Sequence, residues 1–202
     1  MTSRTPHPEL PKNLALIGGR GCGKSSIAKR LARCNRHFML FSLDALIRYE
    51  RGARSIPEIV AEEGWRGFRE HEYEVVRKVS AFAGGALLDC GGGVVVDLDE
   101  SGAEVYSARK VEALRRHSLV VYLERDVDYL IARIGDDPGR PELSVSEDFH
   151  AIMARRDPWY RTAADLVLEC GDRSKTALTR AVLEWFYGRI GVDVAEAARA
   201  LR

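Results

Sequence analysis

The chain has 202 residues, which is enough for one well-buried core and close to the usual span of a single domain, roughly 100 to 200 residues. Its 31 basic and 30 acidic residues leave a formal net charge of +1, so no overall field would attract nucleic acid or an anionic membrane. No apolar run approaches the ~18 residues of a membrane span, and residues 1–11 lack the apolar core of a secretory signal. We therefore expect a cytoplasmic monomer whose partner is a small molecule.

Strands and helices are predicted to alternate after a disordered lead at residues 1–11. Apolar runs predict strands at residues 14–17, 37–41, 86–90, 119–123 and 166–168. Helices are predicted at residues 25–33, 45–49, 105–116, 127–134 and 176–187, with two more in residues 56–80 that break near residues 64–67. This order is typical of an α/β fold with an open parallel five-stranded sheet and helices on both faces.

We expect one domain at residues 12–190. Within it, residues 135–147 are rich in Gly, Pro and Asp and poor in large apolar side chains, so they bury little surface and are predicted to form a mobile lid. Residues 191–202 are predicted to form an Ala-rich helical tail, to which we assign no role.

Cysteines and histidines indicate neither a metal site nor a disulfide framework. The four cysteines are widely separated without a Cys-x-x-Cys pair, and none of the five histidines is followed by another four residues later. We expect reduced thiols and assign the histidines no chemistry.

A phosphate-binding loop is the strongest motif in the sequence. The pattern Gly-x4-Gly-Lys-Ser is formed by Gly18, Gly19, Arg20, Gly21, Cys22, Gly23, Lys24 and Ser25, between a predicted strand and a predicted helix. Glycines allow backbone N–H groups to surround phosphates, and the helix N-terminus adds partial positive charge. We expect Lys24 to reach the β- and γ-phosphates and Ser25 to bind Mg²⁺. The alternative is an ordinary strand-to-helix turn. Cys22 is either a thiol activated by the helix N-terminus or a small filler.

Further polar and glycine-rich positions follow the other predicted strands. Asp44 follows the second strand, at the edge where open α/β sheets bind ligands, and is a candidate to orient a hydroxyl and take its proton. Gly91, Gly92 and Gly93 follow the third strand, so backbone can approach a ligand there; the alternative is a flexible turn.

Read together, these segments resemble the shikimate kinases, small P-loop kinases with a nucleoside-monophosphate-kinase-like fold. The resemblance runs from about residue 14 to residue 187. It rests on the P-loop, Asp44, residues 68–72 (Phe-Arg-Glu-His-Glu), the glycine triplet, residues 140–143 (Arg-Pro-Glu-Leu) and residues 156–160 (Arg-Asp-Pro-Trp-Tyr).

The resemblance implies ATP-dependent phosphorylation of shikimate to shikimate 3-phosphate, with Mg²⁺. It assigns the substrate carboxylate to Arg69 and Arg156, whose guanidinium groups suit a carboxylate, and acceptor contacts to the glycine triplet and Asp44. Without the motif context, a solvated surface charge would be the better interpretation of either arginine alone. Arg140 resembles the lid arginine that steadies transition-state charge, and Arg133 and Arg173 resemble the residues flanking adenine. Ser26 completes the expected nucleotide site. Glu72, three residues after Arg69, is a candidate to hold that guanidinium in place.

One position departs from the family. Members usually carry two acidic residues spaced Asp-x-Asp, the first of which helps hold Mg²⁺ through water, whereas this chain has Ser42, Leu43 and Asp44. Asp89, at the end of the third strand, is either a replacement metal contact or a structural residue that caps a turn.

Two further functions remain open. The same fold could phosphorylate another polyol or cyclic acid, such as gluconate or a quinate-like compound, because fold alone does not select an acceptor. The second is a nucleotide-binding module without turnover, because Ser42 stands where the family has a carboxylate. The retention of Lys24, Asp44 and Arg140 favours an enzyme.

Overall fold

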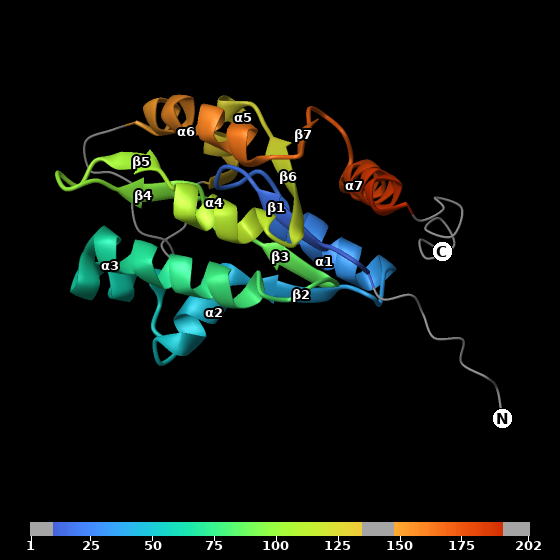
Figure 1. Cartoon of the computed structure of the whole chain (residues 1–202). Coiled ribbons are helices and arrows are strands. Elements are labelled where there is room, and N and C mark those ends of the chain that lie inside the picture. Colours follow the sequence, from blue (N-terminus) through green and yellow to red (C-terminus); the bar gives the residue numbers. More distant parts are fainter. Residues whose placement is uncertain (1–9, 135–147, 192–202) are drawn as a thin grey trace.

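The computed structural model describes residues 10–134 and 148–191, which form a parallel five-stranded sheet covered by helices (Figure 1). The sheet order is β2-β3-β1-β6-β7. Its strands are β1 (Asn13–Ile17), β2 (Met39–Ser42), β3 (Ala86–Asp89), β6 (Ser118–Glu124) and β7 (Leu166–Glu169). A separate antiparallel hairpin consists of β4 (Val96–Leu98) and β5 (Glu104–Tyr106). The helices are α1 (Lys24–Cys34), α2 (Leu43–Glu50), α3 (Ile56–Val79), α4 (Ala108–Arg115), α5 (Val127–Ile134), α6 (Phe149–Ala163) and α7 (Lys175–Ile190).

The core lies along the central strands. Every residue of β1 and β3 is buried, which is why both segments are continuous apolar runs in the sequence rather than alternating ones. β1 pairs with β3 on one side and with β6 on the other. These three strands therefore fix the positions of the loops that leave their carboxyl ends.

The order of the strands opens a crevice between β1 and β3. From β1 the chain crosses to β2 in one direction, whereas from β3 it crosses to β6 in the other. Because such crossovers are right-handed, α1 and α4 lie on opposite faces of the sheet. The contacts agree: α1 packs on β1, β2 and β3 and against α7, while α4 packs on β6 and against α3. Adjacent strands whose connections leave to opposite faces form the usual ligand crevice of an open α/β sheet.

The predicted architecture is confirmed, and all five predicted strands are present. The predicted helix at residues 105–116 is wrong at its start, because residues 104–106 form β5 and the helix begins only at Ala108. The predicted break in residues 56–80 falls at Gly64, whose φ of 69° and ψ of 174° interrupt α3. The hairpin and α6 were not predicted.

Within the described ranges, no helix combines the length and apolar character that crossing a bilayer requires. The predicted lead, lid and tail lie outside those ranges, apart from residues 10, 11 and 191.

Candidate active site

The phosphate-binding loop connects β1 to α1 and relies on left-handed backbone at its glycines. Gly18, Gly21 and Gly23 have φ values of 139°, 87° and 103°, which side chains rarely permit. A Cβ on Gly18 would also lie 2.8 Å from the carbonyl oxygen of Leu123. Gly23 is the N-cap of α1, so the first N–H groups of the helix open directly on the loop. This is the geometry that a phosphate site requires.

Lys24 is folded over this loop. Its Nζ donates to the carbonyl oxygens of Gly18 at 2.8 Å and Gly19 at 2.9 Å, and lies 3.6 Å from Sγ of Cys22. Burial lowers the pKa of the Lys24 ammonium, but the nearby Cys22, Tyr160, Asp89 and Asp44 outweigh that effect and raise it overall. Lys24 is therefore a fixed cation at the loop. Cys22 is 1% exposed and forms part of the core, which fits the role of a small filler.

A first cavity, which we call the phosphate cavity, opens beside the loop. Its empty space is about 1080 Å³, part of it open to solvent. Its lining includes Arg20, Gly21, Gly23, Lys24, Ser25, Ser26, Ser42, Asp44, Arg48, Asp89, Gly91, Gly92 and Arg133. Arg133 belongs to the last turn of α5, beside Gly21. Arg173, in the turn after β7, does not line this cavity.

Asp89 stands next to Ser42 in this cavity. The two residues are register partners at the ends of β3 and β2. Paired residues of adjacent strands point to the same face, and both line the phosphate cavity with Ser25. A hydroxyl and a carboxylate suit Mg²⁺, which uses one or two carboxylates, phosphate oxygens and water rather than an all-protein cage. The described residues contain no cluster of three or more His, Cys, Asp or Glu side chains suited to a metal.

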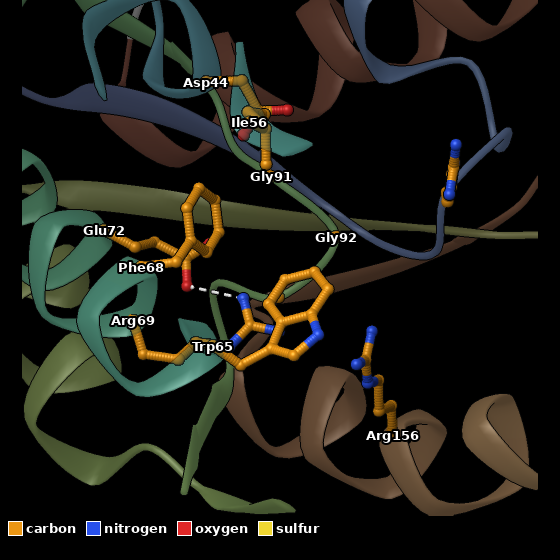
Figure 2. A pocket seen from close by; sticks show the side chains of 11 residues that line it. Asp44, Ile56, Trp65, Phe68, Arg69, Glu72, Gly91, Gly92 and Arg156 are labelled. Carbon is orange, nitrogen blue, oxygen red and sulfur yellow. Dashed lines mark hydrogen bonds and ion pairs between the residues drawn. The ribbon is translucent and has the colours of Figure 1, made fainter. Parts of the chain in front are cut away.

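A second cavity, the acceptor cavity, adjoins the first (Figure 2). Its empty space is about 490 Å³. It is lined by Arg20, Asp44, Ile56, Trp65, Phe68, Arg69, Glu72, Gly91, Gly92, Gly93 and Arg156. Arg20, Asp44, Gly91 and Gly92 line both cavities. Asp44, in the first turn of α2, thus lies where a group bound at the loop would meet one bound in the acceptor cavity.

Arg69 enters the acceptor cavity from α3 and is 4% exposed. Its Nη1 donates to Glu72 at 3.1 Å, the predicted contact, and its guanidinium lies 5.1 Å from the ring centroid of Trp65 (Figure 2). Within the part of the chain that the structure describes, Nε of Arg69 is buried without a hydrogen-bond partner. Buried donors are rarely left unpaired, so this atom indicates an anionic or polar ligand.

Glu72 is itself held from the opposite side. Lys110 of α4, fully buried, donates to Glu72 at 2.9 Å and lies 3.4 Å from Asp97 of β4. Burial raises the pKa of the Glu72 carboxyl, but Lys110 and Arg69 outweigh it and lower that pKa overall. Glu72 is therefore an anion that fixes Arg69.

Arg156 enters from α6, across the cavity from Arg69 (Figure 2). It is 2% exposed, and its Nε donates to Glu104 of β5 at 2.9 Å while its Nη2 pairs with the other oxygen of the same carboxylate. Burial lowers the pKa of Arg156, but Glu104 and Tyr160 outweigh it and raise it. Two buried guanidinium groups on different helices thus face one cavity.

The structure gives a further physical reason for the glycine triplet. None of its glycines has a left-handed φ. Instead, a Cβ on Gly93 would lie 1.9 Å from Nη1 of Arg69, and a Cβ on Gly91 would lie 2.7 Å from Oδ1 of Asp44. Gly91 and Gly93 therefore leave room for the two side chains that the acceptor cavity requires.

Several residues of the site were missed from the sequence. Trp65 lies four residues before Arg69 on α3, a spacing that could have identified it. Lys110 and Glu104 reach the site only through tertiary contacts, and no local pattern marks them. Arg140, predicted to act at the phosphates, lies outside the described residues.

Comparison with known proteins agrees with this geometry. The family model described as "Shikimate kinase" matches residues 20–187. The chain is 40% identical to the shikimate kinase of Leptospira biflexa serovar Patoc over 173 residues, which cover 86% of this chain and 94% of that protein. It is 35% identical to the shikimate kinase of Pseudomonas entomophila over 177 residues, covering 86% and 95% of the two chains.

Solved structures give the same result. Shikimate kinase from Acinetobacter baumannii in complex with shikimate superposes with a TM-score of 0.77 at 28% identity, over 90% of this chain and 96% of that chain. A gluconokinase from Sinorhizobium meliloti, at 14% identity and a TM-score of 0.53 over 91% and 96% of the two chains, shares the fold alone. The matched residues 20–187 include the loop from Arg20 onward, both arginines and the glycine triplet, and on this ground the chain belongs to the shikimate kinase family.

Proposed function

We propose that the protein transfers the γ-phosphoryl group of ATP to a hydroxyl of shikimate, giving shikimate 3-phosphate and ADP. The observation that carries this proposal is the arrangement of Arg69 and Arg156. They come from different helices, are both buried, and line one cavity that adjoins the phosphate-binding loop across Asp44.

The two arginines suit a small carboxylate. A guanidinium group binds a carboxylate in a planar, charge-assisted geometry, and the unpartnered Nε of Arg69 offers a donor. Each such hydrogen bond contributes roughly 1.5 to 3 kcal/mol, or about 10 to 100-fold in affinity. Gly91, Gly92 and Gly93 form the backbone wall of the same cavity.

In the transfer step, Asp44 accepts the proton of the attacking hydroxyl. The hydroxyl oxygen forms a bond to the γ-phosphorus as the bond from that phosphorus to the bridging oxygen of ADP breaks. Asp44 suits this role because it lines both cavities and therefore faces the boundary that the phosphoryl group crosses.

The phosphates are bound by the loop, with the N–H groups of Gly21, Cys22 and Gly23 around them and Lys24 as the neutralising cation. Ser25 and Asp89 would hold Mg²⁺, which supplies charge neutralisation at the phosphates, and Ser26 completes the nucleotide site. Arg133 and Arg173 flank the adenine ring in this proposal, and Arg140 contributes a further charge at the phosphates. In this proposal the protein is monomeric and cytoplasmic, and it has no nucleic-acid or membrane partner.

The test is ATP-dependent phosphorylation of shikimate by the purified protein with Mg²⁺, beside gluconate, quinate and a reaction without acceptor. We expect turnover with shikimate alone. Turnover with gluconate or quinate instead would reassign the acceptor, and nucleotide binding without transfer to any of them would indicate a non-catalytic module. An Arg69→Ala variant with unchanged shikimate affinity would remove the basis for the assignment of the acceptor cavity.

A further inference from the structure

The β4–β5 hairpin follows the glycine triplet in the chain and lies between α3 and α6, the helices that carry Arg69 and Arg156 (Figure 1). Its first strand is tied to the triplet, since the N–H of Val96 donates to the carbonyl oxygen of Gly93 at 2.8 Å. Arg66 of α3 donates to the carbonyl oxygens of Leu98 and Asp99 in the same hairpin. The hairpin is thus anchored to α3 before the chain reaches Glu104.

The turn of the hairpin is fixed by its own side chains. Oδ1 of Asp99 accepts hydrogen bonds from the N–H of Ser101 at 2.9 Å, from the hydroxyl of Ser101 at 2.6 Å and from the N–H of Ala103 at 3.0 Å. Because Glu104 follows Ala103 and pairs in register with Leu98, its backbone position is set by this turn.

Glu104 then meets α6 at Arg155 and Arg156. Nη2 of Arg155 lies 3.0 Å from Oε2 of Glu104, and the Arg155 side chain is partly exposed. The Arg156 side chain, by contrast, is only 3% exposed. Glu104 engages Nε and Nη2 of Arg156, so it occupies one edge of the planar guanidinium. Nη1 is the nitrogen that Glu104 does not engage, and Arg156 lines the acceptor cavity.

We propose that Glu104 is a positioning residue for acceptor binding: its carboxylate holds the guanidinium of Arg156 by one edge, so that the opposite end of the group faces the acceptor. This inference rests on the proposed function, because it assigns the acceptor carboxylate to Arg156. Arg156 is the counterpart of Arg69, whose Nη1 is held by Glu72. Arg69 and Arg156 therefore each have their own glutamate, one from α3 itself and one from the hairpin.

The charge of Glu104 suits this role. Burial raises the pKa of the Glu104 carboxyl, but Arg156, Arg155 and Arg69 outweigh it and hold that pKa below its usual range. Glu104 is thus an anion at neutral pH, and it keeps Arg156 ordered before the acceptor binds. Ordering a long side chain in advance removes an entropic cost from binding.

The experiment compares Glu104→Ala, Glu104→Gln and the control Glu100→Gln, an exposed glutamate in the turn of the same hairpin. We expect the KM for shikimate to rise about tenfold in Glu104→Ala and less in Glu104→Gln, which keeps one acceptor oxygen. The KM for ATP should not change in any variant, nor should the thermal midpoint in the control. An unchanged or lower KM for shikimate in Glu104→Ala would overturn the proposal; a lower value would show that Glu104 competes with the acceptor.

A second readout requires no substrate. The Nε–H signal of Arg156, identified by ¹⁵N NMR from its loss in Arg156→Lys, should exchange slowly with water in the unmodified protein and rapidly in Glu104→Ala. If the protein fails to phosphorylate shikimate, the proposed function fails, and this signal alone decides whether Glu104 positions Arg156. Equal exchange rates in both proteins would contradict the positioning role.

Discussion

The guanidinium of Arg69 occupies the space that a side chain on Gly93 would fill. A Cβ at this position would lie 1.9 Å from Nη1, 2.5 Å from Cζ and 2.7 Å from Nη2 of Arg69. A Cβ atom essentially never approaches a non-bonded heavy atom so closely, so a side chain at residue 93 and this position of Arg69 exclude each other. The glycine contributes to acceptor binding by its missing atom rather than by its conformation.

Gly93→Ala should therefore raise the KM for shikimate at least tenfold, because Arg69 must leave its contact with Glu72. The KM for ATP should stay within about twofold, since Gly93 does not line the phosphate cavity. Steady-state kinetics with each substrate varied in turn would measure both constants. The matched control is Gly188→Ala in α7, where a Cβ would meet nothing within 4 Å. Equal effects on the two KM values would contradict the steric explanation.

Lys110→Met should destabilise the protein by about 3 to 5 kcal/mol, because it leaves the buried Glu72 without one of its two cations. Urea unfolding would measure the loss. The control is Lys78→Met, which breaks the ion pair of Lys78 with Glu50 at the surface, where the Lys78 side chain is 53% exposed. An exposed pair contributes about 0 to 1 kcal/mol. Similar losses in the two variants would show that Lys110 does not have the structural role that its burial indicates.

The depressed pKa of Asp97 should account for part of the stability that the fold loses in acid. Burial raises its pKa, but Arg109, Lys110 and Ser107 outweigh this and lower the pKa from 3.8 to about 2. A carboxyl whose folded pKa is depressed stabilises the protein above its unfolded pKa, and this contribution is lost as the pH falls from about 4 to about 2. In Asp97→Asn, stability should be lower at pH 7 and should change less across this window. Unfolding curves at several pH values would give the free energy of unfolding of each protein, with Glu100→Gln as the control. If Asp97→Asn and the unmodified protein lost stability in parallel as the pH falls, Asp97 would not be the group responsible.

The fold could be predicted because its signals are local. The apolar runs of β1, β3 and β6 are buried on both faces, and the loop after β1 carries its own glycine pattern. The break in α3 occurs at Gly64, within the stretch where glycines in a helical pattern predicted it. The hairpin was missed because β4 and β5 have three residues each, and residues 105–116 together read as one helix.

The acceptor cavity could be predicted only in part. Arg69 and Glu72 share one helix face, so their contact follows from spacing alone. Glu104 and Arg156 are 52 residues apart, and Lys110 and Glu72 are 38 residues apart. These contacts depend on how the hairpin, α4 and α6 pack, which no local pattern encodes. Burial of a lysine such as Lys110 also contradicts the usual preference of that residue for solvent.

The pairing of Ser42 with Asp89 offers a test of the metal site. Because the two residues are register partners at the edge of the phosphate cavity, a carboxylate at either position faces the same space. We expect Asp89→Asn to weaken binding of Mn²⁺, used as a paramagnetic substitute for Mg²⁺ in the presence of ADP, by about 10 to 100-fold. Electron paramagnetic resonance would measure the free metal directly, without reliance on turnover.

The double variant Ser42→Asp, Asp89→Asn should recover much of that affinity, since it moves the carboxylate to the adjacent strand without changing the net charge. Ser42→Asp alone adds a second carboxylate beside the first, and it should bind the metal at least as tightly as the unmodified protein. If Asp89 only capped a turn, Asp89→Asn would keep that cap and leave metal affinity unchanged, and the double variant would have nothing to restore. Recovery in the double variant is the result that a structural role for Asp89 does not produce, because Ser42 lies on β2 and cannot cap the turn after β3.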